Sequence, residues 1–170
     1  MCQCSPDMSV GDVKIHKSLS ATSLVLASTT TGKLLCDPFL FTGTDAVLSS
    51  NGGKGKVLQV NLKETCSTGT PIKGDIRLMF FAPAGAAITP GTLGATFLNG
   101  SFAKWLGTVD VAAADYKEVG MSALATIHPD LELFSGDNDS DITVIALTNG
   151  TIDYATGATL TLGLAVKQDF

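Results

Sequence analysis

The segment from Ala158 to Gln168 alternates between two kinds of residue with a period of two. One set of positions holds Leu160, Leu162, Leu164 and Val166, and the other holds Thr159, Thr161, Gly163, Ala165 and Lys167. Successive side chains of a β-strand point to opposite faces of its sheet. The pattern therefore predicts a strand with one face in a core and the other against solvent or a partner.

Turn sequences separate this segment from other short apolar stretches. Asn51-Gly52-Gly53 and Asn149-Gly150 favour tight turns because Asn and Gly tolerate a positive φ. Many short strands spaced by such turns are typical of an antiparallel sandwich or jelly roll, and not of a parallel sheet with crossover helices. We therefore predict an all-β antiparallel β-sandwich or jelly roll, with one short helical turn near residues 101–105.

Two neighbouring segments are predicted to pair as a hairpin. Lys56–Glu64 alternates, with Leu58, Val60 and Leu62 on one face, and Gly74–Phe81 is the next strand-like segment along the chain. Successive alternating segments joined by a turn commonly form a hairpin. We therefore expect these two strands to be neighbours in one sheet.

Two later segments also have the patterns of strands. Ile142–Thr148 is apolar along most of its length, which is typical of a strand that is buried on both faces. Val119–His128 alternates, which predicts a single strand with one apolar face. That face would hold Val119, Met121, Ala123, Ala125 and Ile127.

Length and charge limit the number of domains and the kinds of partner. The chain has 170 residues, and we predict one β-sandwich domain over residues 13–170 after an extended polar arm over residues 1–12. The net charge is −5, Arg77 is the only arginine, and basic residues do not cluster along the sequence. Binding to nucleic acid or to an anionic membrane is therefore not expected. We see no secretory signal and no membrane-spanning run, so we expect synthesis in a cytoplasm.

The four cysteines fall into two groups. Cys36 and Cys66 lie in or beside strand-like segments, where we expect reduced thiols that act as small apolar residues. Cys2 and Cys4 could contribute to a zinc site together with His16 and the other two thiols. Because the C-x-C spacing is not that of a common zinc finger and no second close pair follows, a plain N-terminal arm is the favoured interpretation.

An acidic loop provides weak candidates for a metal site. Asp137, Asp139 and Asp141 present carboxylates at alternating positions, and Ca²⁺ prefers oxygen ligands. The sequence departs from the EF-hand pattern because Ile142 stands where the turn glycine belongs. A solvated loop between strands explains the same residues, and no cofactor is expected.

Catalytic motifs do not emerge from the sequence. His16 and His128 are the only histidines, neither lies in a known catalytic motif, and the G-x-S-x-G pattern is absent. We therefore expect no enzymatic activity. Trp105, the only tryptophan, could anchor an interface. The favoured interpretation is that it caps the core where the helical turn joins a strand.

Segments in the second half of the chain carry a resemblance to a known family. A strand that ends in two phenylalanines is followed by a loop rich in Pro, Gly and Ala, an F-x-x-x-L-G-x-V pattern, an Asp-Tyr pair and a final V-x-Q-D pattern. In order, these are Ile76–Phe81, Ala82–Gly94, Phe102–Val109, Asp115-Tyr116 and Val166–Asp169. Asp37-Pro38-Phe39 and the glycine turn before Lys56 fit more loosely. The chain resembles the capsid decoration, or cement, proteins of tailed phages, over roughly residues 13–170.

The resemblance implies a jelly-roll structural protein of the virion. Such a protein is made in the host cytoplasm, sits on the outer capsid surface, often as a homotrimer, and stabilises the lattice of the major capsid protein. Contacts with that partner are expected in the arm and in the loop of residues 82–94. The candidate residues are Cys2, Cys4, Val10, Val13, Ile15, Ile88, Leu93 and Trp105. The alternative is a jelly-roll module that binds glycans or a host surface, with Ca²⁺ held by the acidic loop.

Overall fold

The computed structural model describes residues 14–25, 27–28, 31–48, 53–82, 92–97, 105–134 and 140–169. Within them the chain forms twelve strands and two 3₁₀ turns. The strands are β1 (Lys14–Ala21), β2 (Ala27–Ser28), β3 (Phe39–Phe41), β4 (Lys54–Thr65), β5 (Ile76–Phe81), β6 (Trp105–Val111), β7 (Tyr116–Val119), β8 (Ser122–Ile127), β9 (Leu131–Phe134), β10 (Ile142–Thr148), β11 (Ile152–Asp153) and β12 (Thr159–Asp169). The 3₁₀ turns are η1 (Gly43–Asp45) and η3 (Ala113–Asp115). None of the helical segments in these ranges is long and apolar enough to cross a bilayer.

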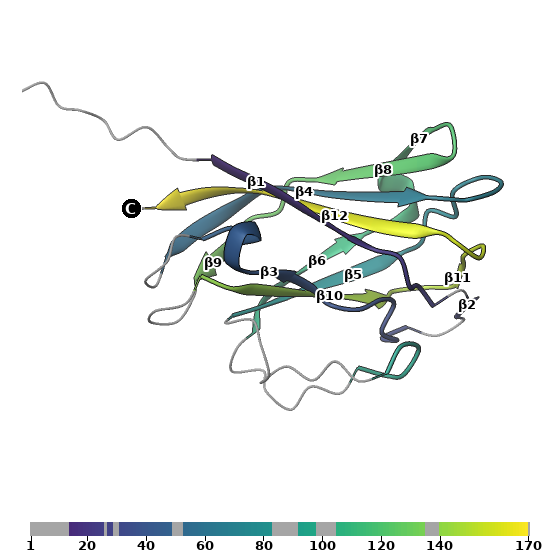
Figure 1. Ribbon diagram of the computed structural model, residues 1–170, viewed down its shortest axis with the longest axis horizontal. Helices are drawn as coiled ribbons and strands as arrows, with labels where there is room; N and C mark the ends of the chain where they lie inside the picture. The colour runs from purple at the N-terminus through teal and green to yellow at the C-terminus, as the bar shows by residue number, and fades with distance from the viewer. Residues whose placement is uncertain are drawn as a thin grey trace, which may run out of the picture.

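The strands form two antiparallel sheets that pack face to face (Figure 1). The larger sheet has the order β1-β12-β4-β8-β7, and β9 pairs with the remaining length of β4, which makes six strands among the described residues. The smaller sheet has four strands in the order β3-β10-β5-β6, and β11 pairs separately with β2. The predicted all-β antiparallel sandwich is confirmed.

The core lies between the two sheets. The predicted alternation of β12 is confirmed, because its four branched apolar side chains, Leu160, Leu162, Leu164 and Val166, are buried. They pack in one cluster with inward-facing side chains of the smaller sheet, including Phe41, Leu78, Phe80, Val144 and Val111. Full burial of each such side chain contributes roughly 1.5–3 kcal/mol. The sandwich is therefore stabilised by residues that alternate along every long strand.

Strand β10 is buried on both faces, as predicted. Val144 belongs to the core between the sheets. Ile145 and Leu147 point the other way and form a second, smaller cluster with Leu34 and Phe81. Residues Leu93 and Phe97 pack against this cluster from outside the smaller sheet. The outer face of the smaller sheet thus carries its own apolar layer.

The predicted hairpin between Lys56–Glu64 and Gly74–Phe81 is wrong. Strand β4 lies in the larger sheet and β5 in the smaller one, so the chain crosses between sheets in the intervening corner. Lys73 has a φ of 57° there, and the buried carboxylate of Glu64 accepts hydrogen bonds from the backbone N–H groups of Lys73 and Gly74. These bonds hold the corner in a conformation that leads away from the larger sheet.

The predicted single strand Val119–His128 is also wrong. Gly120 has a φ of 61°, and the chain reverses there so that β7 pairs with β8 as a hairpin. Val119 and Met121 flank this turn and are 73% and 52% exposed. The alternation continued through a turn whose only local signal is one glycine, which can adopt a positive φ without strain.

A bulge in β4 changes one predicted core position. Val57 pairs with Val166 and Gln59 pairs with Ala165, which leaves Leu58 as an extra residue and only half-buried. Before the bulge β4 pairs with β9, and after it β4 pairs with β8. The Nδ1 atom of His128 lies 3.0 Å from the carbonyl oxygen of Leu58, so the histidine ring lies at the point where β4 changes partner.

Some sequence predictions lie outside the described residues. The arm of residues 1–12 does, and so do residues 101–104 of the predicted helical turn. Trp105 itself is the first residue of β6, so no helical turn includes it.

Candidate binding surfaces

The most buried carboxylate in the described residues belongs to the corner between the sheets. Glu64 is 1% exposed, and its Oε1 atom accepts a hydrogen bond of 2.6 Å from the Tyr154 hydroxyl and one of 2.9 Å from the Gly74 N–H. Its Oε2 atom accepts a hydrogen bond of 2.7 Å from the backbone N–H of Lys73. Burial, together with the charge of Glu64, raises the pKa of both Tyr116 and Tyr154. Because backbone and tyrosine donors occupy both oxygens, we interpret this cluster as a structural anchor.

The other reactive side chains are dispersed over the described part of the chain. His16 lies on β1 and His128 lies beyond the end of β8. Both described cysteines are buried, as predicted, and burial, with the nearby Asp37, raises the pKa of the Cys36 thiol to about 12. No three His, Cys, Asp or Glu residues among those described gather as a metal site. Asp137 and Asp139 lie outside the described residues, and Asp141 is half-buried just before β10.

The outer face of the smaller sheet carries a hollow beside Trp105, which we call the Trp105 hollow. Its volume is about 550 Å³. It is lined by Gly32, Arg77, Met79, Thr96, Phe97, Trp105, Thr108, Asp110, Leu147 and Thr148. The interpretation of Trp105 as a cap of the core is wrong, because the side chain is 45% exposed at the edge of the sheet.

An aromatic pair and an Arg–Asp pair fix the positions of side chains at the Trp105 hollow. The rings of Phe81 and Phe97 pack edge to face with their centroids 6.1 Å apart. Arg77 and Asp110 are directly opposite on β5 and β6 and form two hydrogen bonds, Nε to Oδ1 at 2.7 Å and Nη2 to Oδ2 at 2.9 Å. The hydrogen bonds from Arg77 hold the pKa of Asp110 below its ordinary value. Sequence analysis missed this pair because the two residues are far apart along the chain.

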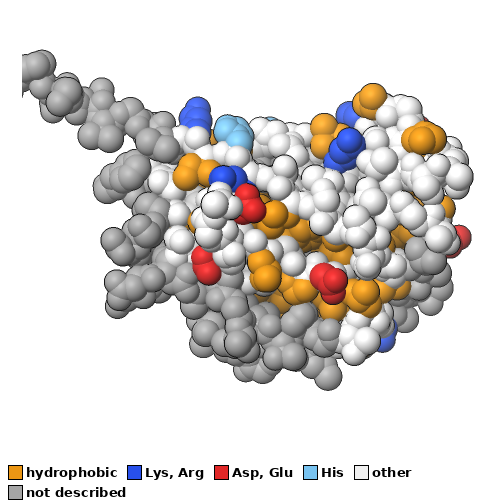
Figure 2. Space-filling model, in the orientation of Figure 1, with side chains coloured by type: hydrophobic (Ala, Val, Ile, Leu, Met, Phe, Trp, Pro, Cys, Tyr) orange, Lys and Arg blue, Asp and Glu red, His pale blue; other side chains and the backbone are white. Residues whose placement is uncertain are grey.

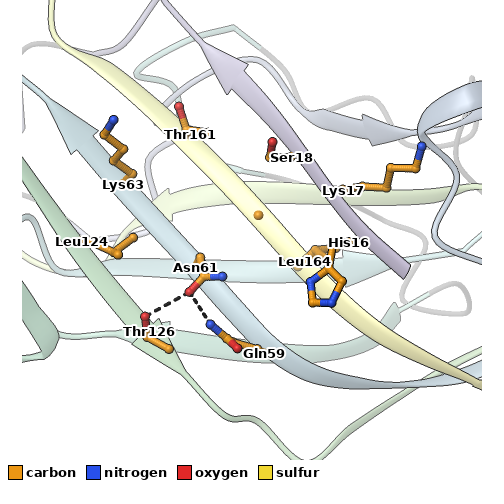
Figure 3. Close-up of a pocket in the computed structure, with 11 residues that line it drawn as sticks. His16, Lys17, Ser18, Gln59, Asn61, Lys63, Leu124, Thr126, Thr161 and Leu164 are labelled. Atoms are coloured by element: carbon orange, nitrogen blue, oxygen red, sulfur yellow. Dashed lines mark hydrogen bonds between the residues drawn. The ribbon is translucent and has the colours of Figure 1, made fainter. Parts of the chain in front are cut away.

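The outer face of the larger sheet has a different character. A hollow of about 540 Å³ lies above Gly163, where β12 presents no side chain (Figure 3). Most of the residues around it are polar. It is lined by His16, Lys17, Ser18, Gln59, Asn61, Lys63, Leu124, Thr126, Thr161, Gly163 and Leu164. We call it the Gly163 hollow.

Hydrogen bonds order the polar side chains of the Gly163 hollow. The Oδ1 atom of Asn61 accepts from Gln59 Nε2 at 2.7 Å and from Thr126 Oγ1 at 3.0 Å, as Figure 3 shows. On its other side the hydroxyls of Ser20 and Thr161 lie 2.8 Å apart. Amide and hydroxyl groups on four strands thus have defined positions before any ligand binds.

Lysines gather on this same outer face, which we call the lysine face. It is defined by Lys14, Lys54, Lys56, Lys63, Lys117 and Lys167, which the sheet register and the strand alternation place on one side. The chain has eleven basic residues, and these six described lysines are more than half of them. In Figure 2, Lys and His side chains follow the rim that the larger sheet forms. The sheet register thus brings to one face basic residues that are dispersed along the sequence, and Glu132 of β9 lies among them opposite Lys56.

The remaining partner-binding candidates are distributed as follows. Ile15 is half-buried on β1, and Leu93 is half-buried against the cluster outside the smaller sheet. Five candidates lie outside the described residues or have no described surroundings, namely Cys2, Cys4, Val10, Val13 and Ile88. Figure 2 also shows a band of hydrophobic side chains between the two sheets, on the side where β1 lies beside β3. Leu40 of β3 is 49% exposed.

Comparisons with known proteins add little to this description. No protein-family model matches the chain, and no curated protein matches it. Among solved structures, a chain from a full particle of Israeli acute paralysis virus heated to 63 degrees aligns with 93% of this chain and 72% of its own length, with 9% sequence identity and a TM-score of 0.31. A TM-score this low does not bear on function.

Proposed function

We propose that this chain is a structural virion protein that binds the outer surface of a phage capsid, as a homotrimer, and stabilises the lattice of the major capsid protein. The observation that carries the proposal is the Trp105 hollow. Met79, Phe97 and Trp105 give it an apolar, aromatic lining on a rigid sheet. Aromatic residues, Met and Arg are enriched in protein–protein interfaces, and Trp is enriched among the residues that dominate binding energy.

The segments that resemble decoration proteins also build this hollow. Ile76–Phe81 is β5 and Trp105–Val111 is β6, and the two strands pair antiparallel. Between them they contribute Arg77, Met79, Trp105, Thr108 and Asp110 to the lining. A resemblance confined to buried positions would reflect the fold alone. Trp105 and Thr108 stand at unspecified positions of the F-x-x-x-L-G-x-V pattern, so the resemblance covers the strands that carry the hollow, and the aromatic lining is a feature of this chain.

The predicted contact regions join the sandwich at one end. Phe81 pairs with both Thr143 and Trp105, so residues 83–104 are connected to the smaller sheet at the end where β10 begins. In the larger sheet Lys14 pairs with Lys167 near the end of β12. Figure 1 shows the start of β1 and the end of β12 at the end where β9 finishes. The arm leaves from the larger sheet and the loop from the smaller sheet, both at the same end of the sandwich, which supports a shared interface at that end.

Replacing Trp105 by alanine should weaken capsid binding by about 2 kcal/mol, or roughly 30-fold in Kd, because it removes the largest exposed aromatic group of the hollow. The measurement is titration of stripped capsids with wild-type and Trp105→Ala protein, after wild-type virions have been shown to hold the protein in a fixed ratio to the major capsid protein. Val119→Ala, at the opposite end of the sandwich, is the control and should bind normally. Equal binding of both variants would contradict the proposed interface.

Deletion of residues 1–9 should accelerate dissociation from capsids and leave the fold intact. Strand β1 begins at Lys14, so the deleted residues precede every described strand. An added arm can extend an interface across neighbouring subunits. Circular dichroism and the melting temperature should be unchanged, and the loss of protein from washed particles should be faster. Undiminished retention would show that the arm makes no contribution.

A further inference from the structure

We propose that the lysine face and the Gly163 hollow together bind a linear anionic polysaccharide, a chain of uronic acid residues. This site lies on the larger sheet and goes beyond the proposed attachment to a capsid. It does not involve Ca²⁺ or the acidic loop of residues 135–141.

The sheet register places lysines side by side at one border of the hollow. Lys14 of β1 is opposite Lys167 of β12, and Lys167 is opposite Lys56 of β4. Like charges directly opposite each other destabilise a sheet. The carboxylate of Asp130 lies 2.5 Å from Lys56 Nζ, and Glu132 is the next residue across the sheet on β9. Asp130 therefore compensates the charge of Lys56, and an anionic ligand at this border would contact the ammonium groups of Lys14 and Lys167 on the two adjacent strands.

The opposite border of the hollow also carries lysines. Lys63 of β4 pairs with Thr161 of β12, and Lys117 of β7 lies in the same row, beyond Leu124. Thr161 and Lys167 are separated by six residues along one strand, which corresponds to about 20 Å. A ligand that contacts both borders must therefore be extended and must carry negative charges at both ends.

The surface between the two borders suits sugar rings. Ser18, Gln59, Asn61, Thr126 and Thr161 offer hydroxyl and amide groups, which both donate and accept hydrogen bonds. Gly163 leaves space in the centre, and a volume of about 540 Å³ is within the range of ligand sites in proteins, about 300–1,000 Å³. Because the hydroxyl groups of a sugar have the same dual character, a polyhydroxylated ring can pair with these side chains.

Composition argues against a protein or a nucleic acid as the ligand of this face. Lys and Ser are depleted in protein–protein interfaces, whereas the aromatic residues and Met that are enriched there line the Trp105 hollow on the other sheet. Phosphate groups are commonly held by arginine forks, and the only arginine, Arg77, is on β5 and already pairs with Asp110. DNA also carries about one charge per 1.7 Å, a density that the acidic remainder of the chain opposes. A polyuronate carries one charge per ring.

The test is calorimetric titration of the full chain with three purified probes, oligogalacturonate, oligoguluronate and oligomannuronate. We expect binding to at least one of them, weakened by added salt, and no binding to a neutral malto-oligosaccharide. Lack of binding to all three probes, or equal binding to the neutral oligosaccharide, would overturn the proposal. Single-stranded DNA that binds as tightly as the best probe would also overturn it, since the face would then recognise charge alone.

Two variants locate the site, and a third is the matched control. Gly163→Thr places a side chain in the hollow; an added Cβ would lie 3.5 Å from Asn61 Cβ and 3.8 Å from the nearest backbone oxygens, so the strand accommodates it. Lys63→Gln removes one charge at the border. Each should weaken binding about tenfold, as expected for loss of a charged hydrogen bond or of the space for a ring. Lys33→Gln removes a lysine whose ammonium donates to Thr96 Oγ1 at the other sheet, and it should bind normally.

Retained binding in both Gly163→Thr and Lys63→Gln would overturn the site. An equal loss in Lys33→Gln would do so as well, because the effect would then follow net charge. Trp105→Ala should bind the polysaccharide like the wild type, which separates this proposal from capsid attachment.

Discussion

Replacing Glu64 by alanine is expected to lower the free energy of unfolding by roughly 3 kcal/mol or more, since each buried polar group left without a partner costs about 1–3 kcal/mol. The substitution removes the acceptor of the Lys73 and Gly74 N–H groups and of the Tyr154 hydroxyl. At 1% exposure of Glu64, water cannot replace the lost acceptor without opening the corner. Urea denaturation followed by circular dichroism measures the change.

Matched variants separate the role of the buried acceptor from a general effect of charge. Glu132→Ala removes an exposed carboxylate from β9 and should change stability by no more than about 0.5 kcal/mol. Tyr154→Phe removes one of the three hydrogen bonds to Glu64 and should cost about 1 kcal/mol. If Glu64→Ala unfolds at the same urea concentration as Glu132→Ala, the carboxylate does not hold the corner.

The same carboxylate explains why sequence analysis mispaired β4 and β5. Alternation predicted both strands because it depends only on residues that are close in the chain. The choice of sheet depends on the corner, where Glu64 reaches nine and ten residues ahead to Lys73 and Gly74 and is joined by Tyr154, ninety residues away. No local pattern reports such contacts. The strands were therefore predictable and their partners were not.

The pairing of strands that are distant in the chain also decides which parts of the binding surfaces could be predicted. Trp105 was identified as a candidate anchor because a lone tryptophan near a strand boundary is visible in the sequence. The lysine face was missed because Lys14, Lys56 and Lys167 are far apart in the chain, and only the pairing of β1, β12 and β4 brings them together. The second face of β12, which alternation left open to solvent or a partner, contributes Gly163 and Lys167 to this surface.

The two outer faces of the sandwich have different compositions and point in opposite directions. The Trp105 hollow lies outside the smaller sheet and the Gly163 hollow lies outside the larger one, with the core between them. Aromatic and aliphatic side chains, three threonines and the Arg77–Asp110 pair line the first hollow, whereas hydroxyl, amide and lysine groups line most of the second, so the two hollows suit different ligands. A protein attached through the smaller sheet would therefore keep the larger sheet available for a second partner.

Alkaline pH is expected to unfold the protein steeply, because four buried groups resist losing their protons. Burial raises the pKa of the Cys36 thiol from 9.0 to about 12 and also raises the pKa of Cys66, Tyr116 and Tyr154. In the unfolded chain the two thiols lose their protons near pH 9 and the two phenols near pH 10. Above these values the unfolded state binds fewer protons than the folded state, so stability falls as the pH rises.

The slope depends on how many groups contribute. Each group lowers the free energy of unfolding by about 1.4 kcal/mol per pH unit between its unfolded and its folded pKa. Cys36 and Cys66 therefore act first, from about pH 9, and Cys36 and the two tyrosines together give roughly 4 kcal/mol per unit above about pH 10. A domain with a typical stability of about 5–15 kcal/mol would then unfold within a few pH units. Urea denaturation in reducing buffer at a series of pH values measures the slope. Cys36→Ala should reduce the fall between about pH 9 and 10, and Tyr154→Phe should reduce the steeper slope by about a third. A wild-type slope that is unchanged in both variants would mean that other groups control the alkaline transition.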